Sequence, residues 1–275
     1  MDLNVLMNTE PWQWPENAGE ICLQVLRDSQ ASESDRLIAA ELVGDPVAVN
    51  DAVVETLLFI ATSDNEPEKL RGQALISLGP VLELAEWEGF EDPDEMPITQ
   101  DTFLKMQATL AQLFHDERVA KDVRRSALEA SIRFGSDWHE QAVKKAYADG
   151  DEDWKLTAVF CMQYLPGFKK QILESLHSDN PLIHEHAVHA AGNWEFSEAW
   201  NHIADLASSS DIDKELRLAA IQALGTIEPE KSEMILHDLT SDHEQEVVDA
   251  AYESLGMVDG SLSSFDDDLD DEDLD

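Results

Sequence analysis

One short stretch of the chain gathers residue types that ligate metals or move protons. It reads His184-Glu185-His186-Ala187-Val188-His189. His186 and His189 are three positions apart and would share one face of a helix, where His202 could complete a three-ligand metal site. The zinc-protease spacing is absent, because the residue four after His184 is Val188. We favour solvated helix histidines, and we predict no catalytic residue, no metal and no cofactor.

Other chemistry-bearing residues carry weaker signals. Cys22 and Cys161 are far apart and belong to no CxxC pair, so buried free thiols are expected. The acidic run Asp92, Asp94 and Glu95 is spaced loosely like a calcium loop, but it lacks the central glycine and the glutamate at position twelve. No glycine-rich phosphate loop and no nucleophile motif occurs in the sequence.

The histidine run lies inside a frame that recurs along the whole chain. With Arg217 as an anchor, Ala220 follows at +3 and Gly225 at +8. The other anchors are Arg36, Arg71, Arg124, Lys155, His184 and Val248. With Arg217 included, successive anchors are 35, 53, 31, 29, 33 and 31 residues apart. A period near 30 is typical of stacked helical repeats. The small residue at +3 allows neighbouring helices to approach closely, and we expect the glycine at +8 to end each helix in the left-handed conformation.

In this frame the sequence resembles HEAT-repeat proteins and is similar to the bacterial HEAT-like repeats also found in phycobilisome lyases. The resemblance covers roughly 12–258 and implies an all-α, right-handed α-solenoid of about seven helix pairs. It also implies that the anchor arginines are stacking struts that bond the acidic turn of a neighbouring repeat, rather than ligand contacts. These arginines are Arg36, Arg71, Arg124 and Arg217.

The remaining organisation follows from composition. We expect an N-terminal cap at 1–18, in which Trp12 and Trp14 pack over the first repeat; docking of a partner on these tryptophans is the alternative. The solenoid is expected over 19–258, with 66–84 as one helix of its second pair. Its one irregularity is an acidic insertion loop at 86–101, which Trp87 and Phe90 would pin to the solenoid. The tail at 259–275 is dense in carboxylates and is expected to be disordered.

The resemblance places the second helix of each pair on the concave face, where the +1 and +5 positions would line a groove. The residues proposed to bind a partner there are Leu37, Glu41, Glu129, Leu156, Phe160, Glu185, His189, Leu218, Gln222 and Glu253. A groove that mixes apolar and acidic side chains suits an amphipathic, basic peptide or helix.

The net charge and the apolar content of the chain further restrict the possible classes of function. The net charge is −41 with 18 lysines and arginines, which argues against direct nucleic-acid binding. No apolar run approaches membrane-spanning length, and the start of the chain has no basic or cleavable segment. We therefore predict a cytoplasmic, non-catalytic scaffold or adaptor that binds a protein, most plausibly a basic one. The sequence leaves the oligomeric state open.

Two other classes of function remain open. One is a repeat enzyme, either similar to the chromophore lyases or dependent on a single metal at the His184–His189 cluster. A two-iron site like that of deoxyhypusine hydroxylase, a HEAT-repeat enzyme, is disfavoured because only His184-Glu185 matches its repeated His-Glu pairs. The other class is a mimic of nucleic-acid charge that would block a DNA- or RNA-binding protein.

Overall fold

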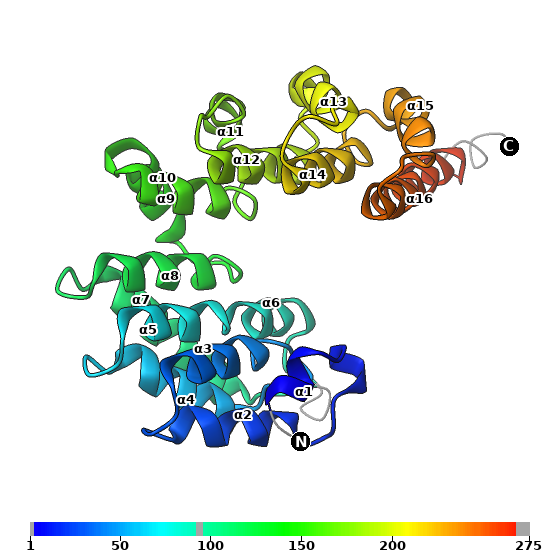
Figure 1. Ribbon diagram of the computed structural model, residues 1–275. Coiled ribbons are helices and arrows are strands. Elements are labelled where there is room, and N and C mark those ends of the chain that lie inside the picture. Colours follow the sequence, from blue (N-terminus) through cyan, green and yellow to red (C-terminus); the bar gives the residue numbers. More distant parts are fainter. Residues whose placement is uncertain (1–2, 92–95, 268–275) are drawn as a thin grey trace, which may run out of the picture. The chain divides into compact units, whose positions relative to one another are not determined.

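The computed structural model describes residues 3–91 and 96–267, and the regular secondary structure of these residues is helical. Seven helix pairs follow one another (Figure 1). They are α2 (Ala18–Arg27) with α3 (Glu33–Leu42), α4 (Asp51–Thr62) with α5 (Glu68–Ile76), α7 (Gln100–His115) with α8 (Lys121–Ser131), α9 (His139–Asp149) with α10 (Glu152–Cys161), α11 (Lys169–Ser175) with α12 (Pro181–Asn193), α13 (Trp200–Ser208) with α14 (Lys214–Leu224), and α15 (Pro229–Leu239) with α16 (Gln245–Asp267). The expected all-α solenoid of about seven HEAT-like pairs is confirmed.

The helices form two compact units, Met1–Gln141 (unit 1) and Ala142–Asp275 (unit 2). In unit 1 the second helices α3, α5 and α8 pack on one another in order, as do the first helices α2, α4 and α7. In unit 2 the second helices α10, α12, α14 and α16 do the same. Figure 1 shows α12 and α14 in one row of unit 2, with α11 and α13 in the other. Each unit is thus a two-layered stack that buries apolar surface between its layers.

Polar residues at the helix starts explain where several helices begin. Asp151, Asn180 and Asp213 precede α10, α12 and α14, and the side chain of each accepts hydrogen bonds from backbone N–H groups of the first turn. Such N-caps satisfy donors that have no partner within the helix. The acidic and Asn-Pro turns visible in the sequence therefore start the second helices of unit 2.

The small residues of the repeat frame lie in the core, as predicted. The alanines at +3 are at most 2% exposed to solvent. They are Ala39, Ala74, Ala127, Ala158, Ala187, Ala220 and Ala251. Because their side chains are single methyl groups, these buried positions allow neighbouring helices to pack closely.

The prediction that the glycines at +8 end their helices in the left-handed conformation was wrong. Gly225 has the right-handed torsions φ −64° and ψ −23°, and the glycines with positive φ among the described residues are Gly89 and Gly167. A Cβ atom on Gly192 would lie 2.9 Å from the Cβ of Ala223, and one on Gly225 would lie 3.1 Å from the Cβ of Ser254. These glycines therefore permit close contact with the small +6 residue of the next second helix.

The anchor arginines are struts, and the implied bond to the acidic turn of a neighbouring repeat is confirmed for Arg36 and Arg217. The Nε of Arg36, Arg71, Arg124 and Arg217 donates to a carbonyl ten residues earlier, at the end of the preceding first helix. The acceptors are Leu26, Ala61, Phe114 and Ala207. Each strut thereby satisfies a terminal carbonyl that the helix itself leaves unpaired.

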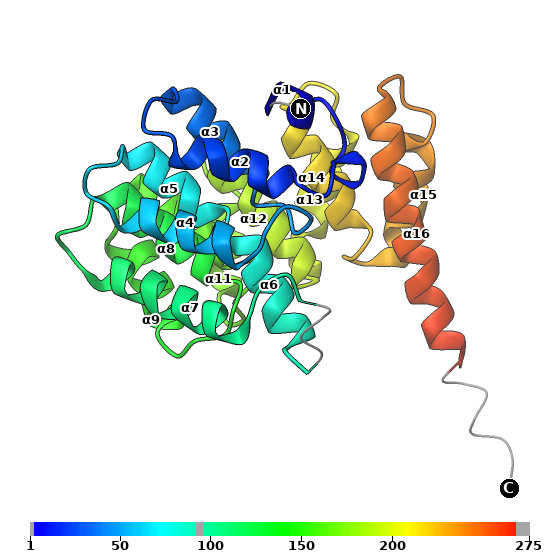
Figure 2. The same ribbon diagram turned by 90° about the horizontal axis from the view of Figure 1, so that it is seen from below.

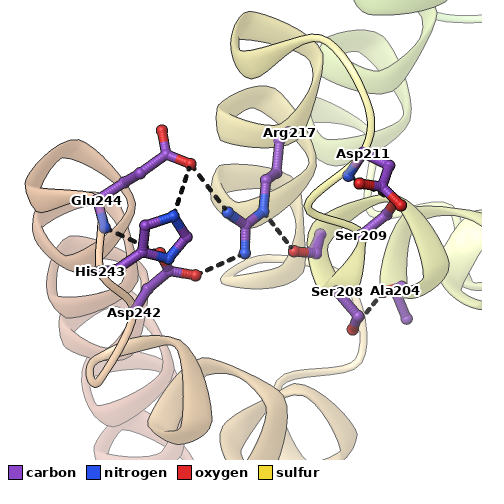
Figure 3. A network of polar contacts seen from close by, with 9 residues as sticks. Ala204, Ser208, Ser209, Asp211, Arg217, Asp242, His243 and Glu244 are labelled. Atoms are coloured by element: carbon purple, nitrogen blue, oxygen red, sulfur yellow. Dashed lines mark hydrogen bonds and ion pairs between the residues drawn. The ribbon is translucent and has the colours of Figure 1, made fainter.

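Two of the struts also reach the next repeat. Arg36 donates to both carboxylate oxygens of Glu66, at 2.6 and 2.8 Å. Arg217 donates to Asp242 at 2.8 Å, with Glu244 3.8 Å away (Figure 3). Arg71 departs from the expectation, because its carboxylate partner Asp64 lies in the turn of its own repeat.

The second pair and the insertion differ from the expected boundaries. The helix expected at 66–84 is broken into α5 and α6 (Gly79–Glu88), because the chain turns at Ser77 and Leu78. Phe90 packs against Phe103 with ring centroids 5.4 Å apart, which confirms it as a pin, whereas Trp87 is 86% exposed and is not one. Asp92, Asp94 and Glu95 lie outside the described residues.

The structure at the two ends of the chain differs in part from the prediction. In the cap, Trp14 donates through Nε1 to the carbonyls of Leu6 and Thr9 and is partly buried, while Trp12 is 76% exposed. At the other end, α16 runs to Asp267, nine residues into the segment expected to be disordered (Figure 2). Residues 268–275 lie outside the described part.

The structure also bears on the predictions for the two cysteines and for membrane-spanning helices. Cys22 and Cys161 are buried free thiols, as predicted, and burial raises the pKa of Cys22 to about 11. That thiol is therefore protonated and unreactive at neutral pH. Within the described residues, no helix combines the length and apolarity needed to span a membrane.

Candidate functional site

The +1 and +5 residues of the second helices, here called the second-helix strip, are accessible to solvent in both units. Each of the ten residues proposed from the sequence is partly or fully exposed, and none is buried. A shift of the frame by one residue would have placed them in the core, so the helical register was predicted correctly. Whether they bind a partner remains a prediction.

In unit 1 the strip opens into a shallow hollow of about 540 Å³. Glu41 and Asp45 supply carboxylates to its lining, while Ile76 and Pro80 supply apolar surface. Ile76 is itself exposed, so the described residues cover this large aliphatic side chain only in part. The hollow is open rather than enclosed, and it suits a side chain of a partner better than a buried small molecule.

In unit 2 the strip includes a carboxylate on a central helix. Glu185 is the +1 residue of α12, which packs against α10 and α14, whose +1 residues are Leu156 and Leu218. The pKa of Glu185 is raised, first by burial and then by the negative charges of Glu215 and Asp213. The salt bridges of the described residues include none to Glu185. This part of the strip is therefore a partly buried acidic centre flanked by apolar side chains.

The histidine run does not converge as the sequence suggested. The Nδ1 of His186 lies 3.3 Å from Nε2 of Gln163, and its ring packs edge-on against Phe160. Burial lowers the pKa of His186 to about 4. His202 pairs with His184 rather than with His186 and His189, so the alternative grouping of those three is not formed. The Nε2 atoms of His184 and His202 lie 2.9 Å apart, so His184 contacts the following first helix, unlike the anchor arginines. The favoured interpretation as solvated histidines is not confirmed either, because His184, His186 and His189 are partly buried.

A second cluster escaped the sequence analysis. Ligand atoms of Asp242, His243 and Glu244 lie within 4.8 Å of one another, which would allow them to hold a cation. Figure 3 shows why they serve another purpose: Arg217 points into the cluster, and His243 also contacts both acids. The guanidinium already pairs with Asp242 and lies near Glu244, so the cluster is the acceptor end of a strut. The acidic turn before α16 was its only signal in the sequence.

Comparison with known proteins supports the repeat assignment. Residues 169–256 and 203–271 match a family model described as HEAT repeats. The resemblance to HEAT-repeat proteins is thereby confirmed. No curated protein matches the sequence.

Several solved structures have a similar course of the chain. Human deoxyhypusine hydroxylase in complex with glycerol is 15% identical, with 94% of this chain and 88% of that chain covered and a TM-score of 0.43. Escherichia coli YibA is 14% identical, with 97% and 91% covered and a TM-score of 0.48. Kap95p bound to RanGDP is 12% identical, with 93% and 43% covered and a TM-score of 0.41. These values are too low to transfer an activity or a partner.

Proposed function

Because this chain carries HEAT repeats, we propose that it is a non-catalytic scaffold that binds a basic, amphipathic segment of a partner protein along its second-helix strips. One observation carries the proposal: in unit 2 the carboxylate of Glu185 is partly buried and makes no salt bridge within the described residues, and the same strip includes the partly exposed Leu156 and Leu218. A lysine or arginine of a partner would neutralise this carboxylate while apolar residues beside it cover the leucines.

The spacing of these residues favours a helical or extended segment as the ligand. Equivalent positions on successive second helices repeat along the strip, so one segment can contact several repeats at once. Phe160 adds aromatic surface on α10, and large rigid rings contribute strongly to binding at the centre of an interface. The hollow beside Ile76 in unit 1 is a second place where an apolar side chain could insert.

The charge of the whole chain supports a basic partner. At −41 the protein attracts cations over a long range, which accelerates association and makes it sensitive to salt. The same charge opposes direct binding to nucleic acid. We further propose a cytoplasmic location, since the buried free thiols suit a reducing compartment.

The test uses a fluorescein-labelled helical peptide of alternating leucine and lysine pairs, with binding measured by anisotropy. We expect Glu185→Lys and Phe160→Ala each to weaken binding by about tenfold or more, as loss of a contact worth over 1.4 kcal/mol would. Glu174→Lys is the matched control, because Glu174 is exposed on the first helix α11 and changes the net charge equally. Circular dichroism would confirm that each variant is folded.

Two outcomes would count against the proposal. Equal weakening by Glu185→Lys and Glu174→Lys would mean that net charge alone attracts the peptide. Unchanged binding in Phe160→Ala and Glu185→Lys would mean that the second-helix strip of unit 2 is not the site. Affinity purification at low salt, followed by mass spectrometry, would then identify the natural partner and show whether it is basic.

A further inference from the structure

The side of α16 that faces away from α14 has no helix packed on it in the described part of unit 2. An internal second helix packs against the preceding second helix on one side and against the next one on the other. α16 is the last described helix, and Figure 1 shows no other helix of unit 2 beyond it. The surface of α16 that corresponds to a stacking surface elsewhere is therefore open to solvent.

The +4 position of the repeat frame shows this difference most clearly. In the other second helices the +4 residue is 0% exposed. These residues are Ala40, Leu75, Leu128, Val159, Val188 and Ile221. In α16 the +4 residue is Tyr252, and it is 61% exposed. A position that is buried in the other repeats thus presents a large aromatic ring to solvent.

The +8 glycine of α16 also lacks the neighbour that its equivalents have. A Cβ atom on Gly192 would lie 2.9 Å from the Cβ of Ala223, and one on Gly225 would lie 3.1 Å from the Cβ of Ser254. Both contacts receive the small +6 residue of the next second helix. A Cβ atom on Gly256, the +8 residue of α16, would meet no atom within 4 Å. Glycine inside a helix is unfavourable relative to alanine, so Gly256 keeps a costly socket that no described residue fills.

Charges at the border of this surface indicate what could cover it. Asp249 and Glu253, the +1 and +5 residues of α16, are exposed carboxylates. The anchor is Val248, so α16 lacks the arginine with which Arg36 and Arg217 reach an acidic turn of the following repeat. An occupant therefore meets carboxylates rather than a guanidinium. Because the chain has a net charge of −41, a second copy is repelled from this surface and a basic helix is attracted to it.

We propose that the end face, defined as Val248, Tyr252 and Gly256 of α16, binds an amphipathic α-helix of a basic partner protein. This helix places an alanine or a serine against Gly256, packs apolar side chains on Tyr252, and directs lysines or arginines toward Asp249 and Glu253. It extends the stack of second helices by one member, through the packing that the repeats already use. Although Asp249 and Glu253 also belong to the second-helix strip, occupation of the end face does not depend on binding along that strip.

A probe for the end face can be taken from the chain itself. A fluorescein-labelled, hydrocarbon-stapled peptide of residues 245–258 carries Ser254, the small +6 residue that packs against Gly225 in the solenoid. Lysine replaces the exposed acidic residues of this peptide. We expect it to bind the full-length protein in anisotropy measurements, and more weakly as sodium chloride is added. A matched peptide with Ser254→Leu should bind about tenfold more weakly, because leucine is too large to pack against Gly256.

Two variants of the full-length protein change the end face at exposed positions. Gly256→Ala fills the socket and Tyr252→Ala removes the exposed ring, so each should weaken binding of the peptide by about tenfold. Gly256→Ala should also raise the melting temperature, because alanine favours the helix and the added methyl group meets no atom of unit 2. Lower affinity together with higher stability separates a docking role from a structural one. Phe160→Ala, which changes the second-helix strip, is the control and should leave the affinity unaltered.

Three results would overturn the proposal. The first is equal binding of the peptide by wild type, Gly256→Ala and Tyr252→Ala. The second is loss of binding in Phe160→Ala with both end-face variants unaffected, which would assign the peptide to the second-helix strip and leave the proposed function intact. The third is a wild-type dimer in sedimentation velocity that Gly256→Ala dissociates, because a second copy of the chain would then occupy the end face.

Discussion

The two units use the same repeat frame but different chemistry at its anchor. In unit 1 the anchors are Arg36, Arg71 and Arg124, and each bonds a carbonyl of the preceding first helix. In unit 2 they are Lys155, His184, Arg217 and Val248. The +3 alanines, by contrast, are buried throughout both units. The small, buried +3 position is thus the same in both units, whereas the anchor residue and its contacts vary.

Removing the arginine strut of unit 2 should have the largest effect. Side chains of Arg217 and Asp242 are only 6% and 11% exposed, so Arg217→Ala leaves a nearly buried carboxylate without its guanidinium and removes the donor to the Ala207 carbonyl. Breaking a buried pair in this way costs about 3–5 kcal/mol. Urea unfolding followed by circular dichroism measures the loss of unfolding free energy.

The matched control for the strut is Lys214→Ala. Lys214 pairs with Glu246 and joins the same two helices, α14 and α16, but both side chains are well exposed. Exposed pairs of this kind contribute only about 0.2–1 kcal/mol. If the two variants lose equal stability, burial does not distinguish the strut from an ordinary surface ion pair.

Glycine positions should give effects of intermediate size and opposite sign. Gly192→Ala places a methyl group 2.9 Å from the Cβ of Ala223 and should destabilise unit 2 by about 1–3 kcal/mol through overpacking. Gly256→Ala, in α16, meets no atom within 4 Å and should stabilise the helix by about 0.5–1 kcal/mol. The same urea titrations measure both. A stabilising Gly192→Ala would disprove the close-contact role of Gly192.

The pH dependence of stability concerns unit 1, and its effect vanishes at neutral pH. His139 is fully buried, with its Nε2 3.0 Å from the Ser131 hydroxyl, and burial lowers its pKa to about 4. Because the unfolded-state pKa is near 6.5, the unfolded chain takes up a proton first as pH falls. Stability is therefore complete above pH 6.5 and decreases toward pH 4, by about 2 kcal/mol at pH 5.

The variant that tests this contribution is His139→Gln, which keeps a hydrogen-bonding group but does not titrate. Its unfolding free energy should change less than that of wild type between pH 7 and 5. Replacing the exposed His237 by glutamine should leave the wild-type slope unaltered. A slope in His139→Gln as steep as in wild type would show that other groups control the acid sensitivity.

Much of the fold could be predicted because the repeat is a local pattern. Alanine at +3 and the capped turns before the second helices identify each helix pair from adjacent residues, without knowledge of distant contacts. The same register predicted the accessible strip. Once the +3 residue faces the core, helical geometry directs the +1 and +5 residues away from it. Helix ends were less certain, as the break between α5 and α6 shows, because Ser77 and Leu78 carry no strong stop signal.

The sequence by itself determined the repeat, its register and the acidic character of the surface. Tertiary structure alone decided which side chains meet across the repeats: His184 with His202, Gly192 with Ala223, and Arg217 with Asp242. These partners lie 18 to 31 residues apart, and their meeting depends on how tightly one helix pair stacks on the next. Periodicity places a residue on a face of its helix, but only the packing of that face against another helix selects its neighbour.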